Sequence, residues 1–231
     1  MASSVESSFK SSSLVSGSTY TTASYTIAGS NRVLYVLVGS GAGTPVDPSS
    51  VKWGGSGGTS LTQIGTTINM GAVVKISLWR LIAPASGANT IYVSWGSSQD
   101  ERWVLAVNVQ DTDQATPNNT VAQATGTTTA VTVNASSTSG QLVLDFMSWV
   151  DLGNNARTVT VGAGQTSLQE IEGATLGYEG AGTSWETAAG ASTTMSWTIS
   201  GSIDNTGIYA FSLNDASAAT VPAGRCIYVH P

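Results

Sequence analysis

The chain has 231 residues, of which 41% are hydrophobic and only 10% are charged, and its formal net charge is −6 at pH 7. This length and apolar content are enough to bury a core without disulfide bonds. The eight Lys and Arg residues are scattered through an acidic chain, which argues against a nucleic-acid partner. One cysteine and one histidine supply neither a disulfide nor the usual metal ligands, so we predict no metal and no cofactor.

The first 18 residues, MASSVESSFKSSSLVSGS, are rich in serine and poor in apolar side chains. We expect residues 1–18 to form a flexible N-terminal arm. They contain no basic segment followed by an apolar stretch, and we find no run of about 18 apolar residues in the chain. The sequence therefore predicts a protein made in the cytoplasm, with no signal peptide and no membrane contact.

From residue 19 to residue 215, short runs of β-branched and aromatic residues alternate with turn residues at intervals of roughly 8 to 12 residues. RVLYVLVGS and QLVLDFMSWV are typical of these runs. The pattern predicts an all-β fold, a jelly-roll-like antiparallel β-sandwich.

The sandwich region contains an internal repeat. Five segments of the first half have a counterpart, in the same order, in the second half: NRVLYVLVGS and GQLVLDFMSWV, VKWGG and VTVGA, TSLTQI and TSLQEI, GANTIYVSW and GASTTMSW, WVLAVNVQD and IYAFSLND. We therefore predict two pseudo-repeats, at about 24–111 and 129–214, each supplying about four strands to one common sandwich. Residues 112–130 form a polar crossover that we expect to contain a further strand.

The pair Asp111 and Asp113 sits at the end of a predicted strand, where alternate carboxylates could bind calcium. No third or fourth acidic residue follows, and the glycine of a calcium-binding loop is missing. We interpret the segment as a turn.

Glu170 and Glu172 lie two residues apart on a predicted strand, so both carboxylates would point the same way, as in the acid pair of a glycosidase. In the first repeat Gln63 and Gly65 stand at these positions, while the Thr, Ser, Leu and Ile around them are kept. We interpret the glutamates as the solvated face of a strand and predict that the protein is not an enzyme. A glycoside hydrolase that uses this pair is the least favoured alternative.

The seven tryptophans divide into two groups. Most lie inside strand patterns, as core residues do, but Trp53 and Trp185 flank glycine-rich loops. An exposed aromatic ring can stack on a sugar, so these two are the candidate carbohydrate-binding residues.

Residues 216–231 form a linker followed by a short apolar strand that contains Cys226, Ile227, Tyr228 and Val229. Such a strand either folds back onto the edge of its own sheet or adds to the sheet of a neighbouring subunit. We name these four residues as the candidate partner-binding site.

The succession VKWGGSGGTSLTQIG, ISLWRLIAPASGANTIYVSW, GQLVLDFMSWV and TMSWTISGSIDNTGIYAFSLN resembles a jelly-roll-like β-sandwich family found in bacteriophage structural proteins and bacterial surface proteins. The resemblance covers about residues 19–215 and implies a binding or structural module. It carries no catalytic residues over to this chain.

With no signal peptide in view, we predict a virion protein that decorates or cements a phage capsid. Its expected partners are the major capsid protein, or another virion protein, and further copies of itself, for example in a trimer. The alternative is a carbohydrate-binding or host-receptor-recognition module of a tail fibre or bacterial surface protein, with a glycan as ligand.

Overall fold

The computed structural model describes residues 1–153, 155, 157–172 and 179–217. Within these ranges the chain forms nineteen β-strands, all paired antiparallel, and no helix. The predicted all-β sandwich fold is confirmed, and its jelly-roll connectivity stays a prediction.

The strands form two inner sheets and two outer sheets, and each repeat supplies one of each kind. The first inner sheet has the order β1 (Ser4–Ser13), β11 (Glu101–Gln110), β4 (Val33–Gly41), β8 (Val74–Ile82), β7 (Thr62–Met70). The first outer sheet has the order β2 (Gly17–Thr21), β10 (Ile91–Gln99), β5 (Pro48–Trp53), β6 (Thr59–Ser60). A two-stranded ribbon joins β3 (Tyr25–Ile27) to β9 (Gly87–Asn89).

The second repeat builds the same arrangement. Its inner sheet has the order β12 (Ala122–Gly126), β19 (Asn205–Ser212), β14 (Leu142–Val150), β17 (Glu179–Thr187), β16 (Thr166–Ile171). Its outer sheet has the order β13 (Ala130–Ser136), β18 (Ser192–Ile199), β15 (Val159–Val161).

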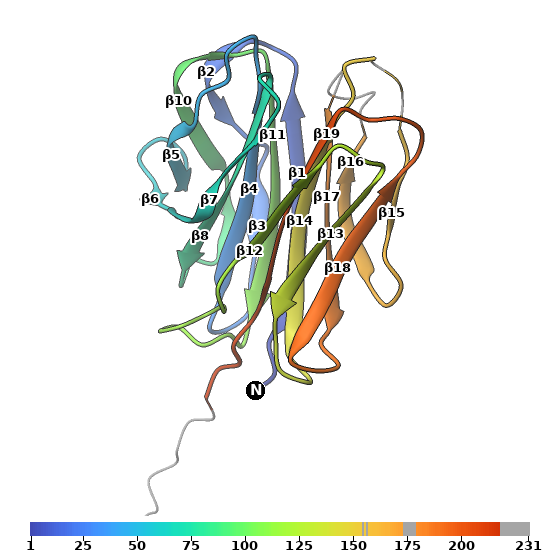
Figure 1. Cartoon of the computed structure of the whole chain (residues 1–231). Coiled ribbons are helices and arrows are strands. Elements are labelled where there is room, and N and C mark those ends of the chain that lie inside the picture. Colours follow the sequence, from blue (N-terminus) through green and yellow to red (C-terminus); the bar gives the residue numbers. More distant parts are fainter. Residues whose placement is uncertain (154, 156, 173–178, 218–231) are drawn as a thin grey trace, which may run out of the picture.

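The four sheets stack as layers, with the two inner sheets face to face in the middle of the molecule (Figure 1). Three apolar cores fill the spaces between the layers. Two of them lie inside the individual sandwiches, and the largest lies between the inner sheets. We call this central one the shared core.

The sequence of the inner strands explains the four layers. In β4 all nine residues are buried: Val33, Tyr35 and Leu37 enter the shared core, and the residues between them enter the core of the first sandwich. A strand covered on both faces is apolar at nearly every position, whereas a strand covered on one face alternates. The outer strand β13 alternates strictly between exposed and buried residues.

The prediction of one common sandwich is therefore wrong. Each repeat forms its own two-layered sandwich, and the two sandwiches pack through their inner sheets. The mostly apolar strands β4 and β14, in which every residue is buried, require this, because a single sandwich would leave one face of each strand in water.

The repeat itself is present in the strand order, since β1-β11-β4-β8-β7 corresponds to β12-β19-β14-β17-β16. The residue registers differ in places. Val51 of β5 pairs with Val93, two residues before Trp95, whereas Val159 of β15 pairs with Ile199, two residues after Trp197. The two repeats therefore share their strand order but differ in the register in which the residues of neighbouring strands pair.

The N-terminal residues are not a flexible arm, which corrects the expectation for residues 1–18. Ser4–Ser13 forms strand β1, which pairs along its length with β11. Backbone hydrogen bonds do not depend on apolar side chains, so a serine-rich segment can form an edge strand. Phe9 anchors it by stacking on Tyr25, with ring centroids 5.1 Å apart.

The two inner sheets meet along two seams. Edge strand β1 lies against β16, and edge strand β7 lies against β12. Because β1 corresponds to β12 and β7 to β16, the two contacts are equivalent in the repeat. The sandwiches thus pack as the two halves of an isologous dimer do. The strand predicted in the crossover is β12, which forms part of one seam.

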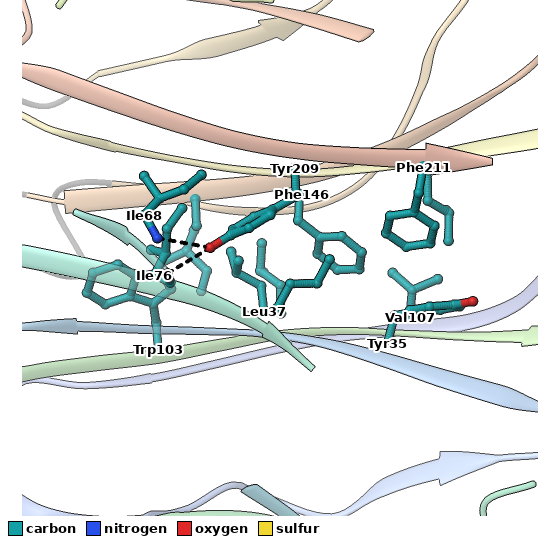
Figure 2. Close-up of a cluster of buried hydrophobic side chains, with 14 of the residues drawn as sticks. Tyr35, Leu37, Ile68, Ile76, Trp103, Val107, Phe146, Tyr209 and Phe211 are labelled. Atoms are coloured by element: carbon teal, nitrogen blue, oxygen red, sulfur yellow. Dashed lines mark hydrogen bonds between the residues drawn. The ribbon is translucent and has the colours of Figure 1, made fainter. Parts of the chain in front are cut away.

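Tyr209 ties the second sandwich to the first through the shared core (Figure 2). Strand β7 contains a β-bulge between Ile64 and Ile68, which interrupts its pairing with β8. The Tyr209 hydroxyl accepts the Ile68 N–H (3.2 Å), and the carbonyl oxygens of Thr66 (2.9 Å) and Ile76 (2.8 Å) lie within reach of its proton. Burial raises the pKa of Tyr209, so its hydroxyl keeps this proton.

We expect the substitution Tyr209→Phe to lower the free energy of unfolding by roughly 1 to 3 kcal/mol, because it removes the hydroxyl that accepts the buried Ile68 N–H beside the bulge. Chemical denaturation monitored by tryptophan fluorescence measures this change. The matched control is Tyr92→Phe, at a half-buried tyrosine whose hydroxyl makes no hydrogen bond to the described residues. Equal stabilities of the two variants would contradict the assigned role.

Candidate functional site

The glutamates singled out in the sequence line a groove of about 510 Å³ at the seam between β1 and β16. Its lining consists of Lys10, Ser11, Ser12, Glu170, Ile171 and Glu172. We call it the seam groove. It exists only because the shared core brings the edges of two different sheets together.

Strands β1 and β16 are joined at the seam by hydrogen bonds from side chains. The Lys10 ammonium donates to the backbone carbonyl oxygen of Glu170 at 2.6 Å, and the Gln169 amide donates to the Ser8 hydroxyl at 3.0 Å. The Glu170 carboxylate accepts a hydrogen bond from the Ser167 hydroxyl at 2.7 Å. Lys10 thus occupies a position on the edge of β16 that a further strand would use.

The seam groove lacks the aromatic surface on which a sugar ring stacks, since none of its six lining residues is aromatic. Glu172 is exposed and Glu170 is half-buried. The arrangement fits the interpretation of a solvated strand face better than that of a glycosidase cleft.

The prediction that Trp53 binds carbohydrate is wrong, because the residue is buried. It is only 3% exposed, its indole N–H donates to the carbonyl oxygen of Ala85 at 3.0 Å, and its ring packs edge-on against Tyr25. A sugar could not reach either face. Trp185 is half-buried and packs against the shared core, so it stays a weaker candidate on its own.

The four predicted tail residues, Cys226, Ile227, Tyr228 and Val229, lie outside the described residues. Asp111 and Asp113 occupy a turn, as interpreted. The Asp113 carboxylate accepts the backbone N–H groups of Ala115 (2.7 Å) and Thr116 (2.9 Å). These two bonds lower the pKa of Asp113 and satisfy the carboxylate locally.

The opposite seam, between β7 and β12, has a groove of about 320 Å³. Here the side-chain amide of Gln123 accepts the Thr66 N–H (2.9 Å) and donates to the Thr66 carbonyl oxygen (2.7 Å). Gln123 is paired with Tyr209, and Lys10 is paired with Leu105 on the corresponding strand. Gln123 and Lys10 therefore have related positions, and both bind the backbone of the strand across the seam.

A second acidic site lies at the pole of the molecule away from the N-terminus, where Asp100, Glu101, Leu152 and Glu179 line a pocket. A Cβ on Gly41 would come within 2.7 Å of a Glu101 oxygen and 2.8 Å of a Glu179 oxygen. Two carboxylates from different sandwiches thus converge over a glycine. Burial, and then the charge of Asp100, raise the pKa of Glu101.

Asp145 is a fully buried acid inside the second sandwich. Its carboxylate accepts hydrogen bonds from the Trp197 indole (2.8 Å), the Gln165 amide (3.0 Å) and the Ser184 N–H (2.8 Å). Burial outweighs these donors and raises its pKa to about 7. The sequence predicted a strand at this position but gave no sign of the network.

In the described part of the chain, no three acidic, histidine or cysteine side chains form a group that could hold a metal ion. The same residues contain no helix suited to crossing a membrane. The residues that the sequence reasoning missed are Lys10, Ser11 and Ser12. A lysine within a serine-rich, alternating segment is a known mark of an edge strand, and it was the available signal.

No protein-family model, curated protein sequence or solved structure matches the chain. Its function must therefore be argued from its own residues.

Because the pKa of Asp145 is raised in the folded chain, we expect the free energy of unfolding to depend on pH. The folded chain holds this proton between about pH 4 and pH 7, whereas the unfolded chain releases it near pH 4, so the free energy of unfolding falls as the pH rises. We expect this group to contribute a fall of about 1.4 kcal/mol per pH unit in that window.

Asp145→Asn, measured by urea denaturation from pH 4 to pH 7, should show a shallower fall than the wild type. Asp47→Asn, at an exposed carboxylate, is the control and should keep the wild-type slope. Parallel profiles for wild type and Asp145→Asn would rule out the buried titration.

Proposed function

We propose that the chain is a non-enzymatic structural protein of a bacteriophage virion, and that it decorates the capsid surface. The observation that carries the proposal is the position of the two ends of the described chain. The N-terminal ammonium donates to the carbonyl oxygen of Ala216 at 3.1 Å, and the Ser3 N–H donates to the Asp215 carboxylate at 2.8 Å.

Both ends therefore lie at one pole, at the foot of the layered body (Figure 1). Residues 218–231 continue from this pole, and they include the apolar tail residues 226–229. This arrangement suits a protein that is attached to the surface of a particle through one pole and exposes its other pole to solvent.

The opposite pole supports contacts between neighbouring proteins on such a surface. Apart from Met1, the exposed large apolar side chains of the described residues are Leu14, Val15 and Leu152. Leu14 and Val15 belong to the β1–β2 turn, next to Ser16, whose hydroxyl donates to Asp100 at 3.0 Å. Asp100 and Leu152 line the same pocket, so these apolar side chains gather at one end.

The experiment is a binding assay with phage particles that lack the protein. We expect the full chain to saturate the particles and a variant without residues 222–231 to lose most of its occupancy, because the tail holds each copy to a neighbouring protein on the particle, either a capsid protein or a further copy of the chain. Occupancy is measured by quantitative gel analysis of sedimented particles.

The control is a variant in which residues 222–231 are scrambled, which keeps length and charge but not the apolar order. It should bind as poorly as the deletion. Full occupancy by either variant would contradict the role of the tail, and a wild-type chain that never binds particles would contradict the proposal.

A further inference from the structure

We propose that the seam groove receives the tail of a second copy of the chain, which pairs as a strand with the free edge of β16. The inference rests on the proposed role of the tail in attachment and names the surface on a neighbouring copy that takes it.

Strand β16 has a free edge, because it ends its sheet and pairs with β17 on one side only. Alternate residues of such a strand turn their backbone N–H and C=O groups away from the sheet, toward any strand that arrives. Across this edge, side chains make the hydrogen bonds: the Lys10 ammonium donates to the Glu170 carbonyl oxygen, and the Gln169 amide donates to the Ser8 hydroxyl. Of the two, Lys10 lies in the seam groove and holds a backbone group of β16, and its flexible side chain can move aside.

The opposite seam, between β7 and β12, is closed differently. There the Gln123 amide makes two bonds to Thr66, one to its N–H and one to its C=O, as a paired strand would. That groove is also smaller, about 320 Å³ against about 510 Å³. At the seam groove, by contrast, the backbone of β16 is held by Lys10 through one carbonyl oxygen, that of Glu170, and there is more space.

The groove and the tail carry opposite charges. The seam groove carries the carboxylates of Glu170 and Glu172. The tail, residues 218–231, contains no acidic side chain, and its one Arg, Arg225, directly precedes the strand-forming run CIYVH. An arginine at the start of an added strand can pair with a carboxylate beside the edge, while the backbone of the following residues pairs with β16.

The length of the tail favours a second copy over the chain's own tail. Ala216 is bonded to the N-terminal ammonium of Met1, and the groove begins at Lys10, nine residues further along the chain. That is about 30 Å along an extended chain, and the nine steps from residue 216 to residue 225, which include Pro222, span at most about 32 Å when fully extended. The chain's own tail would have almost no slack, whereas the tail of a neighbour is free of this limit.

The test uses the full chain and charge exchange, with self-association measured by sedimentation equilibrium. A reductant is present throughout, because Cys226 could otherwise link two tails. We expect the wild type to associate, and Arg225→Glu and Glu172→Arg each to weaken association about fivefold or more. The double variant, which restores opposite charges, should return to within about threefold of the wild type.

The control is Asp47→Arg, which makes the same charge change at an exposed acid outside the groove and should associate as the wild type does. A peptide GRCIYVHP should compete with association of the wild type. A monomeric wild type, an unaffected Glu172→Arg variant or a double variant that fails to recover would each overturn the inference.

Particle binding by the same proteins separates this inference from the proposed function. A monomeric wild-type chain that still occupies particles would overturn the inference and leave the proposed function standing. A chain that associates through the groove but binds no particle would overturn the proposed function and leave the inference standing.

Discussion

The apolar contact between the two inner sheets organises the molecule. Tyr35, Phe146 and Phe211 meet in the shared core, with the rings of Tyr35 and Phe211 only 4.6 Å apart between centroids. Apolar surface that is buried here cannot be covered within either sandwich, because the other face of each inner sheet already packs against its own outer sheet. The two sandwiches therefore need each other.

The grooves and the polar contacts follow from that packing. Once the inner sheets face each other, their edge strands lie side by side at two seams. Each edge strand exposes backbone N–H and C=O groups that are not paired within its own sheet. Lys10 and Gln123 meet this need from related positions of the two repeats, in two different ways. The difference between these two side chains is what makes one seam a candidate docking edge.

Much of the fold could be predicted from the sequence, because strand periodicity is local. The runs that became β4, β11 and β14, and the order of the repeated blocks, were visible. The runs of β4 and β14 also have apolar residues at both alternating sets of positions, which indicates burial on both faces and not the one-faced burial of a single sandwich. The N-terminal strand was missed because serine content says little about backbone pairing, and β1 is held mainly by its ladder with β11.

The candidate site was only partly predictable. Glu170 and Glu172 were picked out by their spacing, but the groove also needs Lys10, which is 160 residues from Glu170 in sequence. No local pattern joins such positions. Trp53 failed as a surface residue for a related reason, since glycine-rich flanks mark a turn but not the depth of the neighbouring ring. The raised pKa of Asp145 likewise depends on burial between two sheets.

If the shared core joins both sandwiches as described, the molecule unfolds as one cooperative unit. Differential scanning calorimetry of the full chain tests this directly, by comparing the calorimetric with the van't Hoff enthalpy of unfolding. We expect a single transition in which the two enthalpies agree. Two separate transitions, or a calorimetric enthalpy about twice the van't Hoff value, would show that the sandwiches unfold independently and that the shared core does not couple them.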